Sequence, residues 1–142
     1  MKAVLILAVL AFVAFAVYIR LVPSDTVAFH VDPVSAPDPG AGGVKRTVAL
    51  TGTPQDALAA FDAIAMAHPR TTRLAGSVVE GHVTYIARSK WIGFPDYITV
   101  KAAASGTGSE LTILSRLRFG KYDLGVNAAR LDGWLQRLET VQ

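Results

Sequence analysis

Apolar and polar positions divide the chain into a continuous apolar run, a stretch rich in proline and glycine, and a region of regular alternation. The apolar run from Ala3 to Ile19 carries no charge, and Leu21 and Val22 extend it past Arg20. At about 1.5 Å per residue, a helix of this length just crosses the roughly 30 Å hydrocarbon layer of a bilayer. The sequence therefore predicts a transmembrane anchor over residues 1–22, with the lipid bilayer as its partner from Ala3 to Val22.

A cleaved signal peptide is the alternative, because Ala14-Phe15-Ala16 has the small-residue pattern of a cleavage site. The run stays apolar beyond that point, through Val17 and Ile19, which favours retention. Lys2 and the α-amino group slightly favour an amino end in the cytosol. We expect a single-pass protein of the inner (cytoplasmic) membrane of a bacterium, with its C-terminal domain facing the periplasm.

Residues 23–44 are rich in proline, glycine and aspartate. Such a composition buries too little apolar surface to fold alone, so it predicts an extended linker. Within it, His30 and Asp32 form an H-x-D pair, which is a weak metal motif because no third ligand accompanies it. We expect neither a metal site nor another cofactor.

From Lys45 onward the pattern predicts one α+β domain, over residues 45–142. The first segment, Lys45 to Gly52, alternates as a strand does. Thr53-Pro54-Gln55-Asp56 then combines a capping threonine, a proline at the first helical position and an acid in the first turn. Apolar positions at helical spacing follow, and the helix should end at His68-Pro69.

Two pairs of alternating strands come next, one about Glu80-Gly81 and one about Ser105 to Gly108. A last helix should be capped by Asn127. The order strand, helix, four strands, helix predicts a mostly antiparallel sheet of about five strands with two helices packed on one face. On the loop between the strand pairs, Phe94 should join the core, whereas Trp91 could be buried or form an exposed contact.

Composition narrows the classes of function. The chain has 14 Lys and Arg against 11 Asp and Glu, and its bases are scattered, which argues against nucleic acid as a partner. It contains no cysteine, so disulfides, thiolate metal sites and a lipid-modified cysteine are excluded. It lacks a G-x-S-x-G elbow, a phosphate loop and H-E-x-x-H, so enzymatic activity is not expected.

Polar residues gather where the predicted strands end. Arg88-Ser89 would end one strand, Asp96 would open the next, and Ser115-Arg116 would end the last. An antiparallel meander brings these strand ends together at one end of the sheet. The candidate binding cluster comprises Arg88, Ser89, Asp96, Ser115, Arg116, Asp123, Asn127 and Arg130.

Two interpretations of this cluster stay open. In the first, the carboxylates of Asp96 and Asp123 pair with arginine guanidinium groups and tie the crossover to the sheet, as a structural lattice. In the second, one arginine is left unpaired to hold a lipid or small anionic head group. A hydrolase that uses Ser89 or Ser115 is a third and weaker hypothesis, because neither serine has an evident base beside it.

Several short motifs resemble the family called domain of unknown function 1499. The resemblance runs from about Lys45 to Leu138, with Leu117-Arg118 as a departure, and His30-Val31-Asp32-Pro33 is similar to the segment that precedes the domain in some members. The motifs are Arg88-Ser89, Gly93-Phe94-Pro95-Asp96-Tyr97, Ser115-Arg116 and Tyr122-Asp123-Leu124-Gly125-Val126-Asn127. The resemblance implies an exported or membrane-tethered protein, or a plastid one, and brings no established activity.

The leading hypothesis is therefore a non-catalytic envelope protein that docks on a membrane protein as an accessory module. The alternative is a domain that binds a small amphiphile or lipid. The two differ in what they require. A ligand binder needs a pocket of roughly 300 Å³ or more behind the sheet, whereas an interaction module needs an exposed apolar patch.

Overall fold

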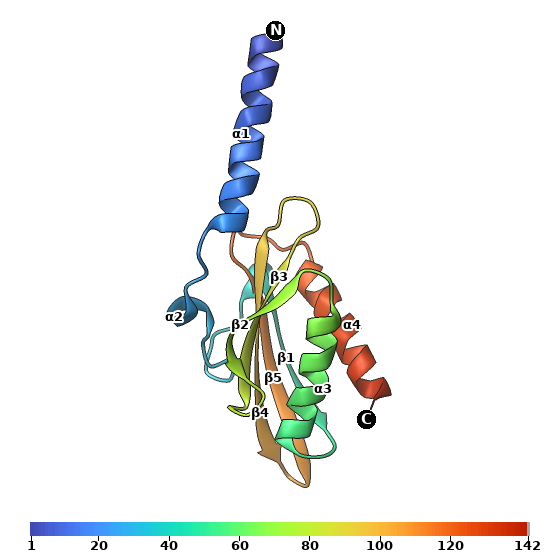
Figure 1. Ribbon diagram of the computed structural model, residues 1–142. Coiled ribbons are helices and arrows are strands. Elements are labelled where there is room, and N and C mark those ends of the chain that lie inside the picture. Colours follow the sequence, from blue (N-terminus) through green and yellow to red (C-terminus); the bar gives the residue numbers. More distant parts are fainter. Residues whose placement is uncertain (142) are drawn as a thin grey trace.

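The computed structural model describes residues 1–141, and it shows a projecting N-terminal helix joined to an α+β domain (Figure 1). The helix, α1 (Lys2–Leu21), leaves the domain at one end and stands clear of it for most of its length. Among the described residues it is the one helix that is long and apolar enough to cross a membrane. Membrane anchors and signal sequences share these two properties.

Five antiparallel strands form one sheet with the spatial order β1-β5-β4-β3-β2. Helices α3 (Pro54–Ala67) and α4 (Val126–Thr140) lie together on one face of it (Figure 1). The predicted α+β class is confirmed. The strands are β1 (Gly43–Leu50), β2 (Thr71–Ser77), β3 (His82–Arg88), β4 (Pro95–Ser105) and β5 (Gly108–Leu117).

The core lies between the sheet and the two helices, and strand alternation selects its members. Val83 and Tyr85 of β3 point into it and are fully buried. Phe61 of α3 places its ring 6.2 Å from that of Tyr85 and 5.7 Å from that of Trp134 in α4. Each large apolar side chain buried in this way contributes about 2 kcal/mol.

Helix α3 begins and ends where the sequence predicts. The Thr53 hydroxyl accepts a hydrogen bond from the backbone N–H of Asp56 at 3.1 Å, and Pro54 occupies the first turn. The helix ends at Ala67, because His68 takes an extended backbone before Pro69.

Residues 23–42, which we call the covering segment, differ from the extended linker that we expected. They lie against the sheet face opposite α3 and α4, and include a short helix, α2 (Thr26–Phe29), and a 3-10 turn, η1 (Gly40–Gly42) (Figure 1). The Phe29 ring stacks on Tyr97 of β4 at 3.7 Å, and the His30 ring stacks on His82 of β3 at 3.9 Å. A composition too polar to fold alone is thus ordered by the sheet that it covers.

The end of α1 packs directly on the domain. Ile19 is only 1% exposed, and Arg20 donates a hydrogen bond to the backbone oxygen of Trp91 at 2.5 Å. The Phe15 ring lies 6.1 Å from that of Phe94, edge to face. Phe94 is half-buried between Phe15 and Phe119 instead of joining the core, because the β3–β4 loop that carries it reaches out along α1.

Candidate functional site

The predicted polar cluster does gather at one end of the sheet, but it is divided between the two faces. The ladders place Arg88 opposite Pro95 and Tyr97 opposite Arg116, so the ends of β3, β4 and β5 lie side by side. Because side chains alternate along a strand, Asp96 and Ser115 face α4, whereas Arg88 and Arg116 face the covering segment.

On the helix face, three elements are joined through Asn127. Its side-chain oxygen accepts hydrogen bonds from the Ser115 hydroxyl at 2.5 Å and from Arg130 at 3.0 Å. Arg130 also pairs with Asp96 at 2.8 Å, and both of these side chains are largely buried. This network fastens α4 to β4 and β5, which is the structural role that the first interpretation of the cluster requires.

Asp123 plays a part that we had assigned to Asn127. Its carboxylate accepts hydrogen bonds from the backbone N–H groups of Gly125 at 2.9 Å and Asn127 at 3.0 Å, at the start of α4. Helix α4 begins after Gly125, whose φ of 79° suits glycine. Asn127 lies inside the first turn and is fully buried, so the predicted asparagine cap is wrong, and an aspartate satisfies the free N–H groups of the first turn.

The two carboxylates have opposite pKa shifts. Burial raises the pKa of Asp96, although Arg130 and the Asn127 amide act to lower it. For Asp123, burial also acts to raise the pKa, but the backbone N–H groups of Gly125 and Asn127 together lower it below the ordinary value. Both carboxylates border a pocket of about 230 Å³ at the sheet end. That volume is below the roughly 300 Å³ that an enclosed ligand site needs.

The remaining members of the cluster are engaged with backbone groups. Arg88 donates to the carbonyls of Gly93 at 2.9 Å and Ile19 at 3.4 Å, and Arg116 donates to that of Ala28 at 2.8 Å. Burial lowers the pKa of Arg116. These two arginines therefore hold the β3–β4 loop, α1 and the covering segment to the sheet.

Neither candidate serine has a base in place. The Ser89 hydroxyl accepts hydrogen bonds from the backbone N–H groups of Gly93 and Phe94 at 3.1 and 2.9 Å. The proton of Ser115 is directed at Asn127. Within residues 1–141, no histidine or carboxylate forms a hydrogen bond with either hydroxyl. This geometry gives no support to the hydrolase hypothesis.

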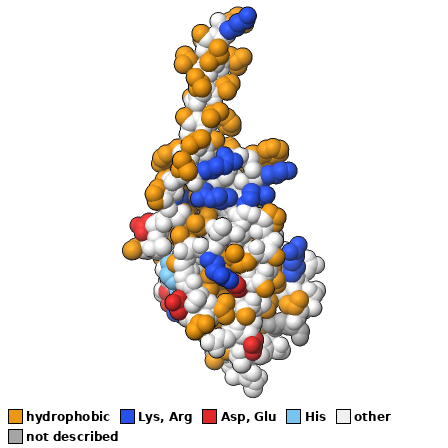
Figure 2. Space-filling view, in the orientation of Figure 1, with side chains coloured by type: hydrophobic (Ala, Val, Ile, Leu, Met, Phe, Trp, Pro, Cys, Tyr) orange, Lys and Arg blue, Asp and Glu red, His pale blue; other side chains and the backbone are white. Residues whose placement is uncertain are grey.

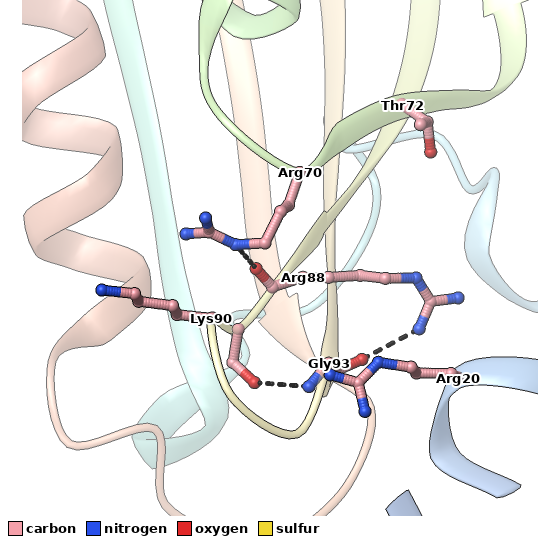
Figure 3. Close-up of a pocket in the computed structure, with 7 residues that line it drawn as sticks. Arg20, Arg70, Thr72, Arg88, Lys90 and Gly93 are labelled. Carbon is pink, nitrogen blue, oxygen red and sulfur yellow. Dashed lines mark hydrogen bonds between the residues drawn. The ribbon is translucent and has the colours of Figure 1, made fainter. Parts of the chain in front are cut away.

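Sequence reasoning missed a second pocket, of about 390 Å³, beside the end of α1 (Figure 3). Its bases are Arg20 of α1, Arg70 before β2, Arg88 of β3 and Lys90 in the following loop. Thr72, Ser89 and Gly93 complete the lining. Because the bases come from distant parts of the chain, no local motif could have revealed this pocket.

A buried acid on α3 was also missed. Asp62 accepts a hydrogen bond from the Tyr85 hydroxyl at 2.9 Å and forms an ion pair with Arg73 of β2. The hydrogen bond from Arg73 lowers the pKa of Asp62 despite its burial. A signal was present, because Asp62 falls one helical turn after Leu58, on the apolar stripe of the helix.

The weak H-x-D pair is engaged elsewhere, since His30 contacts Thr84 at 2.8 Å and Asp32 pairs with Lys101 at 2.8 Å. Among residues 1–141, no three histidine or carboxylate side chains are grouped so as to hold a metal.

Comparison with known proteins places the chain in a family without assigning it an activity. A search of curated proteins finds no significant match. The profile of one family, described as a protein of unknown function (DUF1499), matches residues 24–138. That span includes residues 24–42 of the covering segment, the sheet, α3 and most of α4, in agreement with their packing as one unit. The chain therefore belongs to the DUF1499 family of proteins of unknown function.

Proposed function

We propose that this protein is a single-pass protein of the bacterial cytoplasmic membrane whose periplasmic domain acts without catalysis, as an accessory module docked on a membrane protein. The observation that carries the proposal is the junction between α1 and the domain. Buried Ile19 and the hydrogen bonds of Arg20 and Arg88 hold the domain against the end of α1. A domain fixed in this way presents one end to the bilayer, where a membrane protein can meet it.

Exposed apolar side chains at that end supply a contact surface, which we call the end patch. Tyr122 is 72% exposed and Leu124 is 92% exposed, both in the β5–α4 crossover, and Val126 follows at the start of α4. Large exposed apolar patches mark protein or membrane interaction sites, and this is the role that we assign to the end patch. The space behind the sheet is filled on one face by helices and on the other by the covering segment, which favours an interaction module over an enclosed amphiphile site.

Membrane retention and orientation rest on the sequence and on the junction. Cleavage after Ala16 would remove Phe15, which packs on Phe94. Lys2 and the α-amino group precede the span and favour a cytosolic amino end, against the single Arg20 at its other end. Bases of the folded domain lie too far from the span in sequence to count, because the rule covers about 20 residues.

Co-purification of the untagged full chain in mild detergent tests the proposal. We expect the intact mass to include the residues of α1, and we expect a membrane protein to be recovered in constant ratio. A Tyr122→Ser, Leu124→Ser double variant should lose that protein while remaining folded. Val79→Ser is the matched control, because Val79 is 82% exposed in the turn between β2 and β3, away from the end patch. A species that begins at Val17, or equal recovery with all variants, would contradict the proposal.

A further inference from the structure

Four bases line the pocket beside α1, and no acid is among its lining residues. In the described part of the chain, ion pairs join Arg46 to Asp132, Arg73 to Asp62, Lys101 to Asp32 and Arg130 to Asp96. Arg20, Arg70, Arg88 and Lys90 appear in none of them. Like charges placed together without a counter-charge repel one another, so a bound anion would stabilise this arrangement.

The arginines of the pocket are oriented by carbonyl oxygens, not by carboxylates. Arg20 donates to Trp91, Arg88 donates to Gly93, and Arg70 donates to the carbonyl of Arg88 at 3.2 Å. Figure 3 shows Arg20 and Arg88 on the α1 side of the loop, with Arg70 and Lys90 extending from its other side. A guanidinium carries five N–H donors, so each arginine keeps donors for a phosphate after its carbonyl contact.

In the membrane-anchored arrangement proposed above, the pocket would lie at the level of the lipid head groups. Arg20 is next to the last residue of α1, and the contact of Phe15 with Phe94 lies about 7.5 Å further along the helix axis. Trp91, which is 79% exposed, stands beside Lys90, whose ammonium lies 4.8 Å from the ring centre. Tryptophan next to a base is typical of the membrane interface. In Figure 2 the Lys and Arg side chains form a band where α1 meets the domain.

We propose that this basic pocket binds the phosphate of an anionic phospholipid in the leaflet that borders the domain. The inference rests on the membrane anchoring proposed above and names a second component, a lipid, beside the protein partner. Guanidinium groups match phosphate oxygens bidentately, and a base near a lipid surface strengthens attraction to anionic head groups. Arg20 and Arg88 join the β3–β4 loop to α1. A lipid phosphate bound to both arginines would therefore also restrict rotation of the domain about α1.

Native mass spectrometry of the purified full chain, released from a zwitterionic detergent, tests the proposal with phosphatidylglycerol and phosphatidylcholine as probes. We expect phosphatidylglycerol to be retained at least about tenfold better than phosphatidylcholine. An Arg70→Gln, Lys90→Gln double variant should lower phosphatidylglycerol retention on the order of tenfold, because two of the four charges are removed. These two residues are chosen because, among the described residues, neither forms a hydrogen bond or ion pair with α1.

Arg46→Gln with Arg137→Gln is the matched control, since it removes two exposed bases away from the pocket. This variant should retain phosphatidylglycerol as the wild type does. Lys90→Gln alone is a second test of phosphatidylglycerol retention. The Lys90 ammonium makes no hydrogen bond in the described residues, so its loss should leave folding unchanged, and a lower retention would then come from the lost charge. Equal retention of both lipids, or equal loss in the pocket and control variants, would overturn the assignment.

Inorganic phosphate distinguishes a lipid site from a site for a free anion. If millimolar phosphate displaces phosphatidylglycerol completely, the pocket is a free-anion site and the lipid assignment is wrong. The measurement uses purified protein, so it does not depend on the protein partner. If the wild-type chain retains no phosphatidylglycerol but still recovers the membrane protein, only the lipid inference is refuted. If it retains phosphatidylglycerol but recovers no membrane protein, only the docking proposal is refuted.

Discussion

Asp96 and Asp123 border the same pocket but stabilise the fold in different ways. Asp96 neutralises Arg130 inside the interface between α4 and the sheet, where both side chains are largely withdrawn from water. Asp123 holds backbone N–H groups at the start of α4 and forms no ion pair among the described residues. Removal of Asp96 therefore leaves a charge stranded, whereas removal of Asp123 leaves N–H groups that water can reach.

We predict that Asp96→Ala lowers the free energy of unfolding by about 3 kcal/mol, because breaking a buried pair leaves Arg130 uncompensated. Asp123→Ala should cost about 1 kcal/mol, as the loss of a helix cap does. Asp96→Asn should fall between the two, since it keeps the shape and part of the hydrogen bonding. Chemical denaturation of the full chain in detergent measures all three. A larger loss for Asp123→Ala than for Asp96→Ala would contradict this prediction.

At the scale of elements, the covering segment is held to the sheet by a directed chain of hydrogen bonds. Thr99 donates to the carbonyl of Phe29 at 3.1 Å, so its hydroxyl must accept from Thr84 at 2.9 Å. Thr84 has then used its one proton, and His30 must donate through Nδ1. His82 in turn donates through Nε2 to the carbonyl of Val31 at 3.0 Å.

This arrangement makes the covering segment sensitive to acid. Burial lowers the pKa of His82, and stacked His30 and nearby Lys101 lower it further, against the raising effects of the Val31 carbonyl and Asp32. A histidine whose pKa is lowered in the folded state stabilises the fold fully above its unfolded pKa of about 6.5. That contribution is lost as the pH falls below 6.5, because the unfolded chain then binds the proton first.

We therefore expect the melting temperature to fall between pH 7.5 and pH 5, and we expect His82→Gln to reduce the size of that fall. Part of the pH dependence should remain in the variant, because burial also lowers the pKa of His68 beside Trp134. Thermal unfolding of both proteins across this range is the measurement. If the variant keeps the full pH dependence of the wild type, protonation of His82 is not the cause of the fall in melting temperature.

For the whole molecule, the sheet is a layer covered on both faces. Helices α3 and α4 bury one face, and the covering segment shields Tyr97 and Thr99 on the other. The domain boundary at Lys45 is thus an open prediction that the packing makes testable. A chain that begins at β1 keeps every strand but leaves the second face bare.

We predict that residues 43–142 alone are less stable than residues 23–142 by roughly 3 kcal/mol, since the shorter chain exposes Tyr97 and loses the stacked Phe29. Denaturant midpoints of the two truncated proteins give the difference. Starting at Gly43 keeps β1 whole, so the comparison isolates the covering segment. Equal stability of the two truncated proteins would show that residues 23–42 act only as a linker.

Local chemistry determined much of this molecule from the sequence alone. The cap at Thr53 and the break at His68-Pro69 fix α3 through contacts within a few residues. Alternation in β3 separates Val83 and Tyr85 from His82 and Thr84, whatever covers each face. A helix such as α1, uncharged from Ala3 to Ile19, can satisfy its backbone in a bilayer without help from the rest of the chain.

Only the tertiary structure decided which of the polar residues meet. The sequence placed Arg88 and Asp96 near one sheet end, but pairing register sent them to opposite faces. Asp25, Asp32 and Asp38 give the covering segment local turn signals, but its place on the sheet comes from its contacts with β3 and β4. The basic pocket joins Arg20 to Arg70 across distant parts of the chain, and such a site exists only after the strands have paired and α1 has docked. Short-range rules cannot supply contacts whose partners are chosen by the packing of the whole chain.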